Sequence, residues 1–103
     1  MSDAVETLPN GARQSAVDER FDLFPPHALL AVAAVLSRGA EKYGEGNWIG
    51  LPVHSHLNHA VRHVYQWLSG DRSEEHLSHA ACRLLMAVER QRLDDSWSEK
   101  SKP

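Results

Sequence analysis

Residues 55–83, SHLNHAVRHVYQWLSGDRSEEHLSHAACR, decide the fold that this sequence predicts. This stretch and its immediate flank hold six of the seven histidines of the chain. Side chains three, four and seven residues apart share one face of a helix, so these histidines form two stripes. Two helices that face each other would bring both stripes to one polar, nitrogen-rich pocket. The stripes are His56, His59 and His63, and then His76, His79 and Arg83.

Apolar residues at three- and four-residue steps predict three helices. The first begins at Pro26, which suits a first helical turn, and ends near Gly44. The second runs from about Ser55 to Ser69, and the third follows the short connection after Gly70 and ends near Leu93. The apolar stripes expected to form the core are Leu29, Val32, Ala33, Leu36, Ala40 and Tyr43; Leu57, Ala60, Val61, Val64 and Leu68; and Leu77, Ala81, Leu84, Leu85 and Val88.

The predicted fold class is all-α, a small bundle of about three main helices behind an extended N-terminal arm. No strand is expected, and Phe21, Leu23 and Phe24 of the arm should pack on the helices. Residues 10–93 form one domain, with flexible polar ends at 1–9 and 94–103. A domain of this size buries only a modest fraction of its surface, so we expect a homo-oligomer to complete the fold.

The composition excludes several classes of protein. The net charge of −3 argues against binding of a nucleic acid polymer, which needs a basic face. One cysteine, Cys82, rules out a disulfide within the chain and should be a core residue. No segment has the length of a membrane span or the pattern of a signal peptide. The sequence therefore predicts a cytoplasmic protein without a membrane partner.

Basic and aromatic side chains around the histidines suggest an anion site. Arg62, His63, His76, His79 and Arg83, with Lys42, would offer several donors to phosphate oxygens. The alternative is a set of solvated helix residues. In the glycine-rich loop from Gly44 to Pro52, Asn47 and Trp48 would supply hydrogen-bonding groups beside a flat stacking surface for a base. Trp48 would equally well plug the end of the bundle, and both interpretations stay open.

Metal binding has two interpretations in this sequence. Hydrolysis of a phosphoanhydride needs carboxylates that hold Mg²⁺ or Mn²⁺ and orient a water. Glu41 and Glu45 lie one helical turn apart, and Asp71, Glu74 and Glu75 follow the second helix. Glu74 and Glu75 would serve equally as first-turn residues favoured by the helix dipole. A transition metal held by histidines is the other interpretation, with His56 beside His59 or His63, and His76 beside His79.

A series of short motifs runs in order from about Asn10 to Glu89. They are Gly11-Ala12-Arg13, Arg20-Phe21-Asp22-Leu23 with Pro25, Gly39-Ala40 with Lys42-Tyr43-Gly44, Asn47-Trp48 with Gly50, Arg62-His63, Trp67, Gly70, His76-Leu77 and His79-Ala80. In this order the motifs resemble the phage and bacterial dATP/dGTP diphosphohydrolase-like proteins, an all-α family placed near the MazG-like nucleoside triphosphate pyrophosphohydrolases. The connection from Gly70 to Glu75 is shorter and less acidic than is usual in that family.

The resemblance implies an oligomer that hydrolyses a purine deoxynucleoside triphosphate to the monophosphate and pyrophosphate, with Mg²⁺ or Mn²⁺ as cofactor, in a bacterial or phage-infected cell. Carried over by position, Lys42, Arg62, His63, His76 and His79 would face the phosphates, and Asn47 and Trp48 the nucleoside. Glu41 and Glu45 are the catalytic candidates, and Asp71 and Glu75 join them as metal ligands. The alternative is a non-catalytic oligomer that sequesters a nucleotide or nucleotide signal in the same pocket and needs no cofactor.

Overall fold

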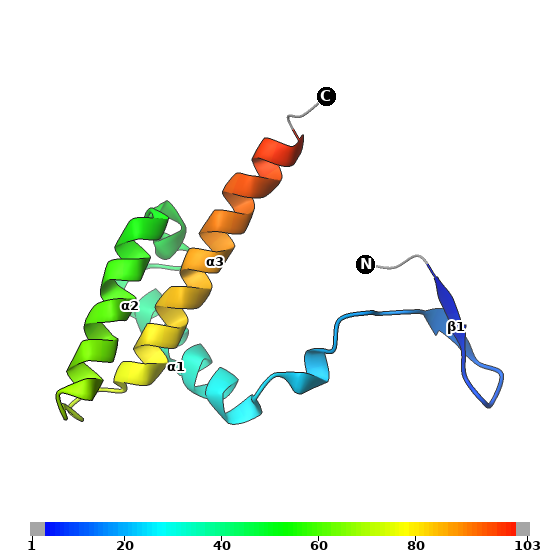
Figure 1. The fold of residues 1–103 in the computed structure, drawn as a ribbon, viewed down its shortest axis with the longest axis horizontal. Helices are drawn as coiled ribbons and strands as arrows, with labels where there is room; N and C mark the ends of the chain where they lie inside the picture. The colour runs from blue at the N-terminus through cyan, green and yellow to red at the C-terminus, as the bar shows by residue number, and fades with distance from the viewer. Residues whose placement is uncertain (1–3, 101–103) are drawn as a thin grey trace.

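The computed structural model describes residues 4–100 and confirms the all-α class, with a small hairpin of two strands added at the N-terminus (Figure 1). The three helices are α1 (Pro26–Tyr43), α2 (Val53–Leu68) and α3 (His76–Lys100). Two short 3-10 helices, η1 (Phe21–Leu23) and η2 (Asn47–Gly50), lie before and after α1. Among the described residues, none of the helices has the length and apolar character needed to cross a lipid bilayer.

The helix boundaries follow the local signals in the sequence. Pro26 stands in the first turn of α1, and the helix ends where the Gly44 N–H donates to the carbonyl of Ala40 at 2.9 Å. Gly44 has a φ of 96°, a left-handed value that favours glycine. The third helix extends to Lys100, beyond the end expected near Leu93. Loss of the apolar stripe does not stop a helix when the following residues include no glycine or proline.

The N-terminal hairpin was not expected from the sequence. Strands β1 (Val5–Thr7) and β2 (Arg13–Ser15) pair antiparallel around the turn at Asn10-Gly11. The Asn10 side chain accepts a hydrogen bond from the Ala12 N–H at 3.0 Å, and Gly11 takes a φ of 89°. Strands of three residues are too short to show an alternating pattern, so only the turn signal was visible.

The aromatic residues of the arm do not pack on the helices, and this prediction is wrong. Phe21 is 67% exposed and Phe24 is 52% exposed. Their rings stack on each other, with centroids 6.5 Å apart. Figure 1 shows the arm leading away from the helices to the hairpin. Residues 1–3 and 101–103, which belong to the predicted flexible ends 1–9 and 94–103, lie outside the described residues. The flexibility of both ends stays a prediction.

The buried core is small and made of small side chains. Val32 and Val35 of α1 pack with Cys82 of α3, and Met86 joins them at the edge. Cys82 is therefore a core residue, as predicted, and burial raises the pKa of its thiol. Where α2 packs on α3 the buried apolar side chains are alanines, which allow two helices to approach closely. These are Ala60, Ala80 and Ala87.

Most of the apolar stripe on α2 and α3 faces outward, which corrects the prediction that it forms the core. Each stripe begins one residue after the positions that face the other helix, His56 and His76. In an antiparallel pair of helices, this offset places both stripes on the same side. Cys82 and Met86, which meet α1, lie on the other side of α3. The exposed stripes, here called the outer apolar face, are Leu57, Val61, Val64 and Leu68 on α2 and Leu77, Ala81, Leu84 and Val88 on α3.

The accessible surface of the chain shows the same imbalance. It measures 8,348 Å². A compact monomer of this mass, 11.5 kDa, would expose only about 5,800 Å² by the usual scaling of surface with mass. Part of the excess comes from the extended arm. The exposed apolar stripes of α2 and α3 contribute to it as well, and a stable interface typically buries about 800 Å² per partner.

We therefore expect the chain to self-associate through the outer apolar face. Leu84→Lys should raise the dissociation constant of the assembly by about tenfold or more, because a lysine there would be buried without a partner. Light scattering coupled to size-exclusion chromatography over a dilution series measures this change.

Leu93→Lys is the matched control for this test. Leu84 and Leu93 are both 47% exposed on α3, and nine residues of helix place them on opposite sides. The control should associate like the unaltered chain. A chain that stays monomeric at all concentrations would contradict the prediction.

Candidate functional site

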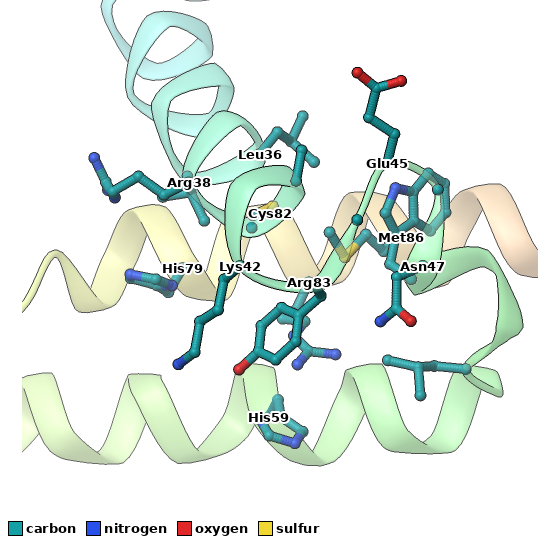
Figure 2. Close-up of a pocket in the computed structure, with 18 of the residues that line it drawn as sticks. Leu36, Arg38, Lys42, Glu45, Asn47, His59, His79, Cys82, Arg83 and Met86 are labelled. Carbon is teal, nitrogen blue, oxygen red and sulfur yellow. The ribbon is translucent and has the colours of Figure 1, made fainter.

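A cavity of about 730 Å³ opens where the end of α1 and the loop after it approach α2 and α3 (Figure 2). Gly44 and Gly46, both with positive φ, let the chain reverse direction between α1 and η2. The volume is in the range of small-molecule binding sites. Its polar lining residues include Arg38 and Lys42 from α1, Glu45, Asn47 and Trp48 from the loop and η2, His59 and His63 from α2, Glu74, and His79 and Arg83 from α3.

The cavity collects most of the site residues expected from the sequence. Those that line it are Lys42, Glu45, Asn47, Trp48, His63, His79 and Arg83.

The other expected site residues lie elsewhere. Glu41, Arg62 and Glu75 are exposed outside the cavity lining. His76 is buried behind His63, and Asp71 lies beside His76.

Three lining residues were not included in the site chosen from the sequence, although two of them, His59 and Glu74, had been considered as metal ligands. Arg38 lies one helical turn before Lys42, a spacing that places both on the same face of α1. His59 belongs to the first histidine stripe, and Glu74 is one of the two adjacent glutamates before α3. The spacing or the residue type marks each of them in the sequence. Neither feature shows which residues from other parts of the chain will lie beside it in the folded protein.

The two histidine stripes face each other across α2 and α3, as the spacing predicted. Nδ1 of His63 lies 2.9 Å from Nδ1 of His76. One turn along the pair, His63 stacks on His79 with ring centroids 4.8 Å apart. Near the other end of the pair, Arg83 donates from Nη1 to Nδ1 of His56 at 3.0 Å.

His56 is fully buried, and both of its ring nitrogens bond to protein groups. A guanidinium can only donate, so Nδ1 accepts from Arg83 and Nε2 carries the hydrogen. That hydrogen is donated to the Trp48 carbonyl at 3.1 Å. Burial lowers the pKa of His56 and keeps it neutral. His56 therefore positions Arg83 and η2, and it has no free nitrogen for the metal pairing with His59 or His63 that the sequence suggested.

Trp48 serves the structure and the cavity at once. Its ring meets His56 edge to face, with centroids 6.3 Å apart, so it closes one end of the helix pair. It is only partly buried and also lines the cavity, with the exposed Asn47 next to it. The structure thus gives Trp48 the plugging role and leaves part of the ring accessible to a ligand.

Cations outnumber carboxylates on the cavity wall. Arg38, Lys42 and Arg83 face only Glu45 and Glu74 as carboxylates. Figure 2 shows Lys42 reaching from α1 toward α2, with Arg83 on that side of the cavity and Glu45 pointing away from it. An anion would therefore meet a local positive field in a chain whose net charge is negative.

Two histidines of the wall, His59 and His63, supply hydrogen-bonding groups more than charge at neutral pH. Burial, with smaller contributions from the charges of Arg83 and Arg62, lowers the pKa of His59. Burial also lowers the pKa of His63, assisted by the neighbouring His79 and His76. The permanent positive charge of the site comes from its arginines and lysine.

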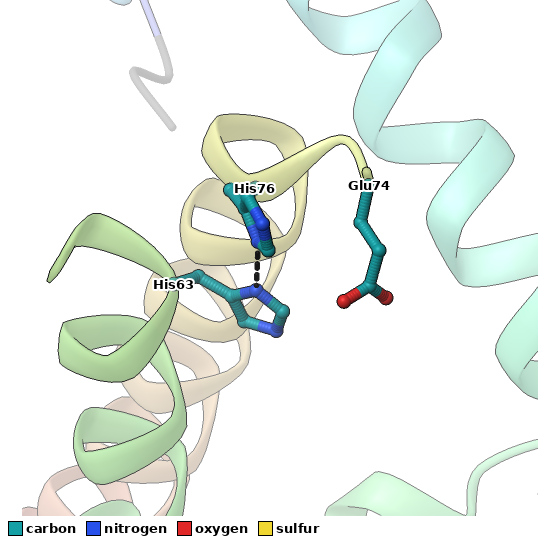
Figure 3. A group of neighbouring side chains, drawn as sticks. All are labelled: His63, Glu74 and His76. Carbon is teal, nitrogen blue, oxygen red and sulfur yellow. Dashed lines mark hydrogen bonds between the residues drawn. The ribbon is translucent and has the colours of Figure 1, made fainter. Parts of the chain in front are cut away.

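Asp71, His76 and His63 form a continuous line of contacts (Figure 3 shows the two histidines with Glu74). Oδ2 of Asp71 lies 3.2 Å from Nε2 of His76, at an angle that does not meet hydrogen-bond geometry. Oδ1 of Asp71 accepts from the Ser73 N–H at 2.8 Å and from the Ser73 hydroxyl at 2.7 Å. These hydrogen bonds lower the pKa of Asp71 to about 2, so it is a carboxylate at neutral pH.

One group of potential metal ligands comes together among residues 4–95, whose side chains are described. The ligand atoms of His63, Glu74 and His76 all lie within 4.8 Å of one another. The set expected from the sequence, Glu41, Glu45, Asp71 and Glu75, forms no such group.

Comparisons with known proteins agree on one family. Residues 9–99 match the family model described as dATP/dGTP diphosphohydrolase, N-terminal. A dATP/dGTP diphosphohydrolase of Salmonella phage PMBT28 is 38% identical over 68 residues, which make up 61% of this chain and 23% of the relative. The match therefore covers less than a quarter of that protein's length. No solved structure matches this chain.

The neutral, buried state of His56 predicts a loss of stability in mild acid. Unfolded histidine has a pKa near 6.5, whereas the pKa of folded His56 is lower. Above about pH 7 neither state is protonated. As the pH falls below about 6.5, the unfolded chain binds a proton that the folded chain does not, so the free energy of unfolding decreases. Asp71 acts only below about pH 4 and stays outside this window.

Thermal unfolding between pH 8 and pH 5 measures this effect. His56→Gln should make the decline shallower, and should cost about 1–3 kcal/mol at pH 8 because Arg83 and the Trp48 carbonyl lose a partner. His54→Gln, at an exposed position on the same helix, is the control and should reproduce the original profile. Equal slopes in the two variants would show that His56 does not titrate in this way.

Proposed function

The chain belongs to the family of the N-terminal region of dATP/dGTP diphosphohydrolases, and from this premise we propose that its cavity binds a purine deoxynucleoside triphosphate for hydrolysis to the monophosphate and pyrophosphate. The family match spans all the residues that line the cavity. The observation that carries the proposal is the excess of cations on the cavity wall. The triphosphate group of such a substrate is negatively charged and would bind to these cations.

The phosphates would bind between α1 and α3. Lys42 approaches from α1 and Arg83 from α3, so an anion between them neutralises charge from two helices; Arg38 also lines the cavity but its side chain extends away from these two. Arg83 uses Nη1 on His56, which fixes the plane of its guanidinium and leaves further N–H groups to donate. Two or more donors on one wall suit an oligophosphate better than a single carboxylate.

The nucleoside would bind at the loop end of the cavity. The accessible part of the Trp48 ring offers a stacking surface, and a purine provides more stacking area than a pyrimidine. Asn47 follows Gly46 at the rim and carries both a donor and an acceptor. This placement puts the base near η2 and the phosphates toward Lys42 and Arg83.

In the proposed reaction a water oxygen attacks the α-phosphorus and the bond to the α–β bridging oxygen breaks, so pyrophosphate leaves. Lys42 and Arg83 would stabilise the negative charge that builds up on the leaving group. Mg²⁺ or Mn²⁺ would add Lewis acid catalysis when bound. Of the two predicted catalytic carboxylates, Glu45 lines the cavity but points away from it, and Glu41 lies outside the lining. The carboxylates expected from the sequence therefore do not fit a metal centre within one chain.

Hydrolysis is supported by the names of the family and of its relative, both described as diphosphohydrolases. No comparison supports the alternative of a binder that sequesters the nucleotide unchanged.

Phosphorus NMR tests hydrolysis directly. The chain is incubated with dGTP, dATP or dCTP in the presence of Mg²⁺ or Mn²⁺, and the purine nucleotides should give monophosphate and pyrophosphate. Recovery of every nucleotide intact would contradict the proposed reaction.

Lys42→Met tests the phosphate site. Loss of one charge-assisted hydrogen bond should raise the dissociation constant or KM for dGTP by about 10- to 100-fold. Arg92→Met, at an exposed position outside the cavity lining, is the matched control and should bind dGTP normally. Equal affinity of the two variants would remove Lys42 from the site.

A further inference from the structure

We propose that His63, Glu74 and His76 bind one divalent transition metal ion at the wall of the cavity, and that Asp71 orients His76 for it. The ion's role in catalysis rests on the proposed function, whereas its binding does not. Figure 3 shows the two imidazoles facing each other and the Glu74 carboxylate directed toward them. The sequence had offered Glu74 among the carboxylates and each histidine in a pair on its own helix, but it did not combine the three residues in one site.

The spacing of the three side chains suits a single ion. The two Nδ1 atoms lie 2.9 Å apart, and a carboxylate oxygen of Glu74 completes a group within 4.8 Å. Nitrogen ligands bind Zn²⁺ at about 2.0–2.1 Å, so two of them around one tetrahedral ion lie about 3.3 Å apart, and the two rings need to separate by only a few tenths of an ångström. Glu74 is exposed on the segment before α3 and is free to move closer.

Asp71 selects the form of His76 that a metal requires. Nε2 of His76 is buried, has no hydrogen-bond partner and lies 3.2 Å from the Asp71 carboxylate. A hydrogen on Nε2 is attracted to that carboxylate, whereas a lone pair there would be repelled by it. The hydrogen therefore resides on Nε2, and Nδ1 presents its lone pair to His63. A carboxylate behind a ligating histidine is a common arrangement in metal sites.

His63 interacts with Nδ1 of His76 in the metal-free state and would bind the ion together with it in the metal-bound state. Without an ion, His63 donates its Nδ1 hydrogen to Nδ1 of His76. With an ion, that hydrogen moves to Nε2 of His63, and both Nδ1 lone pairs point at the metal. His79 stacks on the His63 ring and limits its rotation. The ion would thus replace the hydrogen bond between the two rings, which would turn slightly so that both lone pairs point at it.

The ligand types favour a transition metal over Mg²⁺. Imidazole nitrogens bind Zn²⁺ and related ions well, whereas Mg²⁺ prefers oxygen ligands and keeps most of its water. His63 and Glu74 line the cavity while His76 lies behind His63, so the ion's free positions would face the cavity. A phosphate oxygen or a water there would complete its coordination.

Calorimetry on the full chain, freed of metal with EDTA and then dialysed, tests the site without nucleotide. ZnCl₂ should bind with one ion per chain, at least about a hundredfold more tightly than MgCl₂. Glu74→Gln should weaken Zn²⁺ binding by about tenfold or more, and His63→Gln by about a hundredfold. Asp71→Asn should weaken it by about 10- to 100-fold through His76. Circular dichroism checks that each variant keeps its helices.

Glu75→Gln and His54→Gln are the matched controls, since both positions are exposed and outside the group. Their Zn²⁺ affinity should be unchanged. No Zn²⁺ binding, or equal affinity in Glu74→Gln, His63→Gln and the controls, would overturn the proposal in favour of adventitious binding by exposed histidines. Binding of dGTP by the metal-free chain is measured separately. Zn²⁺ binding without dGTP binding would sink the proposed function alone, and the reverse result would sink the metal site alone.

Discussion

The packing of α2 against α3 through buried imidazoles is the constraint on which the rest of this structure depends. A buried ring nitrogen without a hydrogen bond is costly, so each histidine in the interface restricts what can lie opposite it. His56 requires Arg83 and the Trp48 carbonyl, and His63 requires His76. These pairings fix the register of the two helices more strictly than the small alanines between them, which would tolerate a shift along the axis.

The α2–α3 pair consequently has two sides with different chemistry. On one side lie α1, the cavity and the cations; on the other lies the outer apolar face. The histidines occupy the boundary between the two sides, and they connect the groups that support the fold to the groups that line the cavity. The outer apolar face explains how a chain with so small a buried core can still have strongly periodic apolar residues. Those residues are ordered for a surface that a single chain leaves uncovered.

The site also separates charge from hydrogen bonding. Arginine and lysine supply positive charge at every physiological pH, while the buried His56 is neutral and positions Arg83, and His63 and His76 offer ring nitrogens as ligands. This division suits a pocket that binds an oligophosphate through constant positive charge and that lies beside a metal site, where neutral ring nitrogens donate lone pairs to the ion. Carboxylates are scarce on the cavity wall, and Glu74, one of the two that line it, stands where the nitrogen ligands gather.

The sequence by itself determined the helices, the facing of the two histidine stripes, the core position of Cys82 and the family, because each depends on periodicity or on the order of short motifs. It did not determine what covers the apolar stripes of α2 and α3, since period fixes the direction of a side chain but not its partner. The hairpin was not predicted because strands of three residues are too short to show an alternating pattern. The apolar character of Phe21 and Phe24 did not show whether their rings pack on the helices. Which ligands converge was decided by the tertiary structure alone. Glu74 meets His63 and His76 because a short turn after α2 brings the chain back beside α2. The residue spacing within a single helix cannot predict a contact of this kind, which joins two helices and the turn between them.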